Sequence, residues 1–580
     1  MPKPRFVTVP ELANYVDSGQ RFGVGGLHFV RLPLAALQAV IDAGRRDLHF
    51  VSWGGGLALE LMLAAGAVRR LSFCFCSLDI FGLSPLFRRA LEEQSIEVEE
   101  WTALAMIQGF HAAQQQLPSI PFQLPAGSDM MEISRCTVTA LDPIGHSPVG
   151  AAPPLPMDVF LLHAQRADAE GNVEIQGARG LDLSMAWASR KILVTVEEVV
   201  PPGALQSGPR GAAILPHHFI TAIAESPWGA YPSSCIPYYP TDYRALLVAT
   251  GEVPARIPAL KPERAGWLRK IPRITPPQVH AAALRRHSRD QRGEAPPGED
   301  EIMAVAMARM YDNDSICAVG AVSPLAMVSY LLAKRLHAPD LVIMPLSSGL
   351  IGIASRPMTL MLAESLDMQT AVLHCGGDDT YHQYYQRGLV THEVVSAAQI
   401  DRMARTNNIA IRVSESKTVR LPGQGGMADV ANMHQNFLLY LTRHSPKSLV
   451  MNVDHVSAAR GLLLDEERKS AGYRPGTVRL VTNLAIFQLN HDTRLLELVS
   501  VHPGVSMEQL AAATGFPLQL AKSVSTTEPP SRRELDLLRH EVDPLGIRRL
   551  EFIPSKDRTA LLTELLDSEE AAIQELLTGA

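Results

Sequence analysis

Two long segments of this chain begin with the same succession of patterns. Residues 9–44 contain an amphipathic helix pattern, a short apolar strand pattern that ends in glycines, and a second helix pattern that follows Pro33. Residues 300–335 repeat this order, with Gly320 at the end of the strand and Pro324 at the start of the second helix. A repeated unit of this size indicates a duplicated or fused domain. We therefore expect two related halves in one chain.

Both halves continue with apolar strand patterns that alternate with helix patterns. Strands are predicted at residues 47–53, 70–76, 159–165, 191–197, 341–346, 370–375, 448–453 and 477–482. This alternation predicts two open α/β domains, with parallel or mixed sheets flanked by helices. Charge, glycine and a Pro-Pro pair replace the apolar periodicity over residues 283–301. We interpret that stretch as a linker between domains at residues 1–282 and 302–580.

Composition argues against several classes of function. The formal net charge is -7 and 19% of the residues are charged, without a basic stripe, so no nucleic-acid partner is expected. No uninterrupted apolar run of about 18 residues occurs, so we expect no membrane partner and a cytoplasmic protein. The six cysteines are too scattered for a disulfide framework, and Cys74 and Cys76 alternate along one strand as core thiols. No metal is expected.

The strand predicted at residues 341–346 ends in Ser347, Ser348 and Gly349. Ligands of open α/β sheets bind at the carboxyl ends of the strands. His374 ends another apolar stretch, so a parallel sheet would bring it to the same edge as a candidate base. Serines in a turn also satisfy backbone groups, which is the structural alternative.

Two glycine clusters are candidate binding loops. Gly423, Gly425 and Gly426 lie in the sequence PGQGGMAD, where the absence of Cβ atoms would let backbone N–H groups approach a carbonyl or phosphate. Gly25 and Gly26 lie between a strand and a helix, a second place for such amides. Tight turns or helix ends explain both strings as well.

Three titratable residues accompany these loops. His28 follows the first glycine cluster and would share its cleft, unless it is simply solvated. Glu99 and Glu100 are adjacent, so on a strand they point to opposite sides and at most one faces a cleft. A carboxylate that faces a cleft can act as a general acid or base when burial raises its pKa. A solvated acidic loop is the alternative.

These motifs together resemble the family I CoA-transferases of the glutaconate type, with an A-like and a B-like subunit fused in one chain. In the first half the resemblance is carried by GVGGLHFVRLP, WGGG, SIEVEEW, HAQRADAEGNVEIQG and PWGAYPSSC. In the second half it is carried by KRLHAPD, LHCGG, AAQID, LPGQGGMAD and VSVHPGV. The resemblance covers nearly the whole chain. It implies two related CoA-transferase-like domains, a CoA thioester as substrate, and a chain that can form a homo-oligomer.

In such transferases a glutamate in a Glu-Ser-Gly-type motif attacks the thioester and carries CoA as an enzyme thioester. The resemblance puts Ser347 at that position, with Ser348 and Gly349 behind it. A hydroxyl can form neither the acid anhydride nor the glutamyl thioester. Usual transfer chemistry is therefore not expected.

Three functions stay open. The first is C–C cleavage of an acyl-CoA, by decarboxylation or hydrolytic ring opening, as in diverged relatives that act as 3-methylglutaconyl-CoA decarboxylase and as ring-opening steroid acyl-CoA hydrolase. The second is CoA transfer through another carboxylate, Glu99 or Glu100. The third is acyl-CoA binding without catalysis. We expect the first, because amides of the glycine-rich loop would polarise the thioester carbonyl and stabilise an enolate.

Replacing the serine at the nucleophile position tests the resemblance directly. Ser347→Glu should install CoA exchange between acetate and an acyl-CoA, because it restores the missing carboxylate. Exchange is measured with labelled acetate, with Ser347→Gln as the isosteric control. A folded but inert Ser347→Glu enzyme would mean that the neighbouring site has also diverged.

Overall fold

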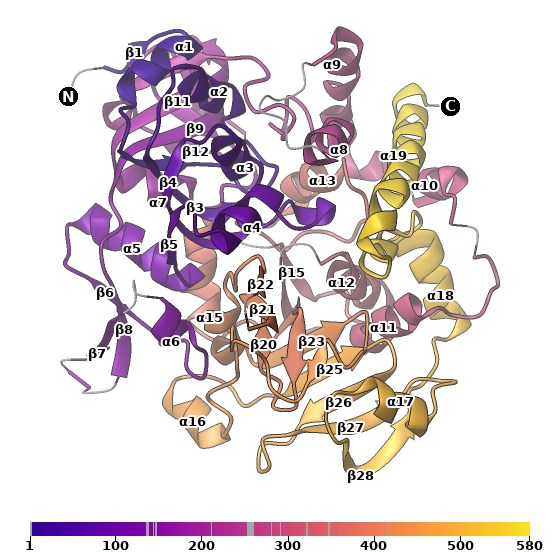
Figure 1. Ribbon diagram of the computed structural model, residues 1–580. Helices are drawn as coiled ribbons and strands as arrows, with labels where there is room; N and C mark the ends of the chain where they lie inside the picture. Colours follow the sequence, from indigo (N-terminus) through magenta and orange to yellow (C-terminus); the bar gives the residue numbers. More distant parts are fainter. Residues whose placement is uncertain are drawn as a thin grey trace.

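A computed structural model describes residues 3–134, 138–142, 144–145, 148–209, 211–251, 260–279, 281–290, 292–320, 323–345, 348–415 and 417–579. Each half contains one large sheet with helices packed around it (Figure 1). The expected fold class, α/β with parallel and mixed sheets flanked by helices, is confirmed. Of the predicted site residues, Ser347 lies outside the described residues.

The first sheet is parallel along its main path, in the order β1-β13-β11-β9-β2-β3-β4-β5. Its strands are β1 (Arg5–Phe6), β2 (Arg21–Val24), β3 (Leu48–Gly55), β4 (Val68–Cys76), β5 (Glu97–Glu100), β9 (Met157–Asp168), β11 (Ser189–Val200) and β13 (Ala222–Glu225). Two short strands extend β9 in antiparallel pairing: β10 (Val173–Ile175) and β12 (Ala213–Leu215).

The second sheet is mixed, in the order β15-β14-β18-β23-β25-β26-β27-β28. It is parallel from β15 to β25 and antiparallel from β25 to β27. Its strands are β14 (Ile316–Val319), β15 (Val342–Pro345), β18 (His392–Ser396), β23 (Asn436–Leu441), β25 (Val478–Thr482), β26 (Ala485–Leu489), β27 (Leu496–Val501) and β28 (Gln519–Thr526).

Smaller sheets lie beside these two. They are formed by β6 (Ile120–Phe122), β7 (Val138–Leu141) and β8 (Pro148–Ala152); by β16 (Leu350–Ile351) and β17 (Leu373–His374); by β19 (Gln399–Asp401), β20 (Thr406–Asn407) and β24 (Leu449–Val450); and by β21 (Ala410–Ser414) and β22 (Lys417–Arg420).

Helices surround both large sheets (Figure 1). In the first half they are α1 (Val9–Leu12), α2 (Leu34–Asp42), α3 (Leu57–Ala64), α4 (Pro85–Glu92), α5 (Ala103–Gln115), α6 (Met130–Ile133), α7 (Asp182–Trp187), α8 (Tyr243–Gly251), α9 (Pro262–Leu268) and α10 (Ala281–His287). In the second they are α11 (Glu299–Ala308), α12 (Pro324–Leu336), α13 (Ala363–Thr370), α14 (Gly377–Asp379), α15 (Met427–Met433), α16 (Asp465–Ser470), α17 (Met507–Ala513), α18 (Arg532–Leu537) and α19 (Ser555–Thr578). A π-helical segment, η7 (Thr380–Tyr385), follows α14.

The repeated opening of the two halves is built alike. In the first half β2 leads through α2 to its parallel neighbour β3, and Pro33 is the N-cap of α2. In the second half β14 leads through α12 to its parallel neighbour β15, and Pro324 is the first residue of α12. Proline fits a helix start because it has no N–H to leave unpaired there.

Two predicted strands do not join the large sheet. The stretch at residues 370–375 contributes only β17, which pairs antiparallel with β16. The stretch at residues 448–453 contributes only β24, which joins β19. The apolar residues of the first stretch are not all buried, since Val372 is 75% exposed. An apolar run predicts a strand, but the sheet that it joins depends on distant neighbours.

The C-terminal helix ties the two halves together. Helix α19, yellow in Figure 1, packs against α10, which begins at the end of the first half and extends into the predicted linker. Arg244 on α8 forms ion pairs with Asp567 and Glu570 on α19, at 2.7 and 2.9 Å. The C-terminal acidic helix therefore contacts both the first half, at α8, and the predicted linker, at α10.

A loop from the second half also docks on the first sheet. The glycine loop, residues 421–426, connects β22 to α15. The N–H of Cys76 donates to the carbonyl of Pro422, and the N–H of Gly425 donates to the carbonyl of Cys74, at 2.8 and 3.0 Å. These bonds attach the loop to the carboxyl end of β4.

Gly423 fits this attachment because it has no side chain. Its φ is +99°, and a Cβ there would lie 2.8 Å from the carbonyl oxygen of Cys74. Gly19 has a φ of +83° and open space around the same position. Gly19→Ala should lower the free energy of unfolding by about 1 kcal/mol through backbone strain alone. Gly423→Ala should lower it by about 1–3 kcal/mol more, because the loop must shift.

Urea unfolding of the two variants, followed by circular dichroism, measures this difference. Equal losses for Gly19→Ala and Gly423→Ala would mean that the close approach to Cys74 does not stabilise the fold.

Candidate functional site

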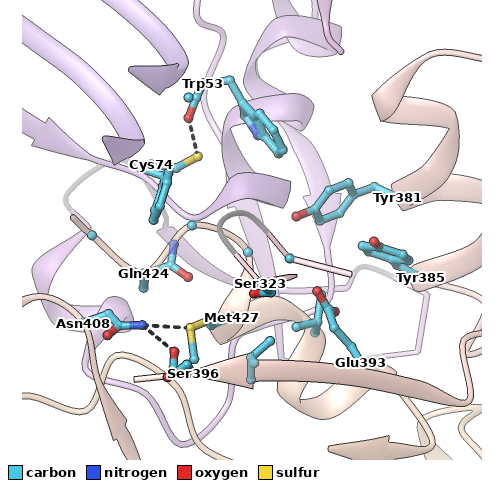
Figure 2. Close-up of a pocket in the computed structure, with 18 of the residues that line it drawn as sticks. Trp53, Cys74, Ser323, Tyr381, Tyr385, Glu393, Ser396, Asn408, Gln424 and Met427 are labelled. Atoms are coloured by element: carbon cyan, nitrogen blue, oxygen red, sulfur yellow. Dashed lines mark hydrogen bonds between the residues drawn. The ribbon is translucent and has the colours of Figure 1, made fainter. Parts of the chain in front are cut away.

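A pocket of about 120 Å³ lies where the two halves meet (Figure 2). The first half contributes its wall through His28, Trp53, Gly54, Cys74 and Phe75. The second half contributes Gly320, Ser323, Tyr381, Tyr385, Glu393, Val395, Ser396, Asn408, Gly423, Gln424, Gly425, Gly426, Met427 and Val430. The carboxyl ends of β3, β4, β14 and β18 all reach it, which agrees with ligand binding at the strand ends of open α/β sheets.

The glycine loop forms one side of this pocket, as the sequence predicts, but not with all of its amides. The N–H of Gly423 donates to the carbonyl of Asn408, and that of Gly425 is bonded to Cys74. Within the described residues, no hydrogen bond is formed by the N–H groups of Gln424 and Gly426. Among the described residues, the unbonded amides of Gln424 and Gly426 therefore alternate along the loop with the bonded amides of Gly423 and Gly425.

His28 lies in the pocket wall, although Gly25 and Gly26, with which it was expected to share a cleft, do not. Its ring packs edge-on against Phe75, and its Nδ1 lies 3.9 Å from a carboxylate oxygen of Asp79. That nitrogen makes no hydrogen bond. The φ of His28 is +52°, so the loop holds this side chain in a conformation that few residues other than glycine adopt.

Glu99 and Glu100 lie on opposite faces of β5, as their adjacency predicts. Glu99 accepts hydrogen bonds from Arg70 and Ser72 on the face away from the pocket. Burial would raise the pKa of Glu99, but hydrogen bonds from His49 and Ser72 lower it to about 2. The charged form of the Glu99 carboxylate is thus stabilised by hydrogen bonds from neighbouring side chains.

Glu100 lies behind the glycine loop. Its Oε2 accepts a hydrogen bond of 2.7 Å from Arg420, and its Oε1 has no hydrogen-bond partner. A Cβ at Gly423 would lie 3.3 Å from that oxygen, so the carboxylate is adjacent to the loop. Glu100 is not part of the pocket wall.

The serine turn after β15 has a clear structural role. The hydroxyl of Ser348 donates to the carbonyl of Pro345 and accepts from the N–H of Leu350, at 3.0 and 3.1 Å. Gly349 has a φ of +79°, and a Cβ there would lie 1.8 Å from the carbonyl oxygen of Cys375. The turn therefore needs glycine at this position to approach the β17 segment.

His374 lies beside this turn, but not through the parallel sheet that we predicted. It lies on β17 opposite Leu350, in an antiparallel pair, and it packs against Gly211. It does not line the pocket. Burial raises the pKa of the adjacent Cys375 thiol to about 11, so the thiol is neutral near pH 7.

Gly25 and Gly26 serve the packing of the first half. The N–H of Gly25 donates to the carbonyl of Leu161, and that of Gly26 donates to the carboxylate of Asp182, at 2.9 and 2.8 Å. Asp182 is paired in turn with the buried Arg31. Both amides are engaged inside the protein, and neither glycine lines the pocket.

Several pocket residues were not predicted from the sequence. The aromatic wall is formed by Trp53, Tyr381 and Tyr385, and buried nitrogen or oxygen atoms of Trp53 and Tyr385 make no hydrogen bond. Glu393 is a carboxylate in the interior of β18, 5% exposed. The sequence around Glu393, THEVVS, mixes polar and apolar residues and therefore gave no clear signal that this carboxylate is buried.

One cluster of described residues has the donor set of a metal site. Donor atoms of His163, Glu197 and Cys235 lie within 4.8 Å of one another. The two ring nitrogens of His163 bond to Thr195 and Glu197, and Glu197 also accepts from Tyr239. The cluster is therefore a closed hydrogen-bond network in the core.

No helix among the described residues is long and apolar enough to cross a membrane.

Comparison with known proteins gives a match over most of the chain. A family model, described as coenzyme A transferase, matches residues 7–226 and 300–513. Subunits A and B of 3-oxoadipate CoA-transferase from Pseudomonas knackmussii are each 29% identical; the matches cover 40% and 41% of this chain and 82% and 91% of the subunits. One chain thus carries an A-like and a B-like region.

Two other relatives match a part of the chain. The IpdA subunit of a cholesterol ring-cleaving hydrolase from Mycobacterium tuberculosis is 30% identical over 42% of this chain and 85% of its own length. An uncharacterised protein of Archaeoglobus fulgidus is 30% identical over 38% of this chain, and the match spans about half of that protein, 49%.

The fold is also that of a solved structure. A thioester complex of the acyl-CoA transferase YdiF from E. coli O157:H7 superimposes with a TM-score of 0.65, over 91% of this chain and 95% of that one. Its sequence is 13% identical, so this likeness concerns the fold alone.

The anchored state of Glu99 predicts a pH dependence of stability. Its pKa falls from 4.5 in a model peptide to about 2 in the fold. A carboxyl group with a depressed pKa stabilises the fold above its unfolded pKa, and the effect is lost as the pH falls toward its folded pKa. The free energy of unfolding should be larger for wild type than for Glu99→Gln at pH 7, and the difference should shrink between pH 5 and pH 3.

Urea titrations at pH 7, 5 and 3 measure this difference. Glu97→Gln is the control, because Glu97 lies on the same strand with its side chain 58% exposed. A gap between wild type and Glu99→Gln that stays constant with pH would contradict the assignment.

Proposed function

Since the chain belongs to the coenzyme A transferase family, we propose that it binds an acyl-CoA thioester and cleaves a C–C bond of the acyl group. Decarboxylation and hydrolytic ring opening are the two forms of this reaction. Both leave an electron pair that must be held on the thioester carbonyl oxygen as an enolate. The site must then supply hydrogen-bond donors to that oxygen and a group that moves a proton.

The observation that carries the proposal is the serine turn after β15. The resemblance puts the transferase glutamate at Ser347, where the sequence has no carboxylate. The hydroxyl of the next residue, Ser348, is engaged in its own turn. A chain that keeps the pocket and the glycine loop but has no carboxylate at this position fits chemistry without an enzyme-bound CoA.

The glycine loop supports the enolate part of the proposal. The N–H groups of Gln424 and Gly426 form no hydrogen bond within the described residues, and both residues line the pocket. Donors held in place by docking need no rearrangement when charge develops on the carbonyl oxygen. Losing one such donor typically costs about 100-fold to 1000-fold in rate.

One of the relatives supports the same class of reaction. A cholesterol ring-cleaving hydrolase subunit is 30% identical to 42% of this chain. We infer from this relative that the same fold can serve for C–C cleavage as well as for CoA transfer.

The second candidate is CoA transfer through Glu100. Its Oε1 has no hydrogen-bond partner and is adjacent to Gly423, which favours it over Glu99. Glu99 faces away from the pocket and is held by Arg70 and Ser72.

Product analysis tests the leading proposal. The enzyme is incubated with unsaturated dicarboxyl-CoA esters and with cyclic oxo-acyl-CoA esters, and products are followed by mass spectrometry. We expect loss of CO2 from the first class or addition of one water to the second. No turnover of either class, together with CoA exchange between acetate and an acyl-CoA, would refute C–C cleavage.

The same incubations separate the alternatives. Transfer through Glu100 predicts an adduct on that residue after hydroxylamine or borohydride treatment during turnover, absent in Glu100→Gln. A binding protein without catalysis would bind CoA esters in calorimetry and leave every ester unchanged.

A further inference from the structure

Glu393 is a carboxylate at the centre of a sheet. It lies on β18 between β14 and β23, opposite Ala318 and Phe437, and 5% of the residue is exposed. Figure 2 shows its carboxylate pointing to the part of the pocket where Tyr385 lies. The nearest basic side chain is His434, the C-cap of α15, whose Nδ1 is 3.0 Å from Oε2.

The polar atoms around this carboxylate are left without hydrogen bonds. Oε2 of Glu393, both ring nitrogens of His434 and the hydroxyl oxygen of Tyr385 are buried and make no hydrogen bond. Oε2 and Nδ1 are within ion-pair distance but do not meet in a directed hydrogen bond. A buried carboxylate that is not fully hydrogen-bonded destabilises a fold, so its position in the pocket wall indicates a role with a ligand.

Among the described residues, few atoms lie close to Gly320 in front of the carboxylate. A Cβ at Gly320 would lie 3.9 Å from both Oε1 of Glu393 and the hydroxyl oxygen of Ser323. Because residue 320 has no side chain, an atom of the substrate or a water has access to the carboxylate at the end of β14.

Among the residues that the structure describes, His434 alone lies within ion-pair distance of Glu393. The other titratable groups that face Glu393 are Tyr330, Tyr381 and Tyr385, and burial raises the pKa of all three phenols well above the usual value. These tyrosines therefore stay protonated near neutral pH and do not supply a base.

We propose that Glu393 is the catalytic acid–base residue of this pocket and that His434 is its positioning residue. The inference rests on the proposed function for its substrate, an acyl-CoA thioester. It adds the group that moves the proton, which neither the glycine loop nor the serine turn supplies.

The proton balance differs between the two forms of the reaction. In hydrolytic cleavage, Glu393 takes a proton from water while the water oxygen bonds to the keto carbon. The C–C bond then breaks, its electron pair moves to the thioester carbonyl oxygen, and Glu393 returns the proton to the α-carbon. In decarboxylation, CO2 leaves, the same enolate forms, and Glu393 delivers to carbon a proton that it regains from solvent.

Exchange of α-protons isolates this step from C–C cleavage. Glutaryl-CoA and butyryl-CoA are incubated in D2O, and deuterium in the acyl group is measured by mass spectrometry. Wild type should catalyse exchange, and Glu393→Gln should slow it by at least 100-fold, the usual contribution of a general acid or base. Glu569→Gln is the matched control, because Glu569 is a buried carboxylate that accepts only from backbone N–H groups of Leu360 and Met361.

Two further variants separate catalysis from folding. Glu393→Asp keeps the charge and withdraws the carboxylate by one methylene, so exchange should fall while the thermal unfolding temperature stays near that of wild type. His434→Gln should lower kcat for exchange without raising KM for the CoA ester, because the imidazole holds the carboxylate in place and does not touch the substrate. A purely structural role for His434 would leave both constants of the folded variant unchanged.

The outcomes distinguish this inference from the function on which it rests. Exchange by wild type without cleavage of either ester class would refute the proposed function and leave the role of Glu393 standing. Exchange that survives in folded Glu393→Gln would overturn the inference, as would the absence of exchange by wild type with both esters.

Discussion

The docking of the glycine loop on the first sheet is the interaction on which the site depends. Its backbone bonds to Cys74 and Cys76 continue through the N–H of Ala103, which donates to the carbonyl of Gly425 at 3.1 Å. Just beyond the loop, Asp429 accepts from the N–H of Leu104 at 3.0 Å. Because these contacts come from the carboxyl end of β4 and the start of α5, they fix the loop to the edge where ligands bind. Without these contacts the glycine loop would not be held against the first half, and the two sides of the pocket would not be brought together.

This docking also explains the distribution of charge at the interface. Burial raises the pKa of Asp429 to about 7, so that it can be neutral near physiological pH although it is hydrogen-bonded to a backbone N–H. Glu100 is held instead by Arg420, at 2.7 Å. Glu393, across the pocket, lies 3.0 Å from the imidazole of His434. Three buried carboxyl groups thus have three different partners, and only Glu393 is in contact with the pocket.

Local periodicity predicted those parts of the fold that depend on near neighbours. The α/β class, the repeated strand-helix-strand openings and the opposite orientations of Glu99 and Glu100 follow from patterns of apolar and small residues a few positions apart. The antiparallel pairing of β16 with β17 could not be predicted in this way, because it joins segments more than twenty positions apart. For that reason the sequence predicted a parallel sheet beside His374, whereas the structure pairs it antiparallel with Leu350.

The sequence by itself indicated that this chain is a fused pair of α/β halves and that glycines cluster in one loop, which the structure places between β22 and α15. It also contains Ser347 at the position where the family resemblance puts a glutamate. Only the tertiary structure decided which amides of that loop remain unbonded and which carboxylate meets the pocket. Glu393 lies on the short strand HEVVS, which has no clear apolar pattern, and the role proposed for it depends on Gly320 and His434, which reach it from neighbouring elements. Hydrogen bonds and burial join residues far apart in the chain, whereas sequence patterns register only neighbours along it.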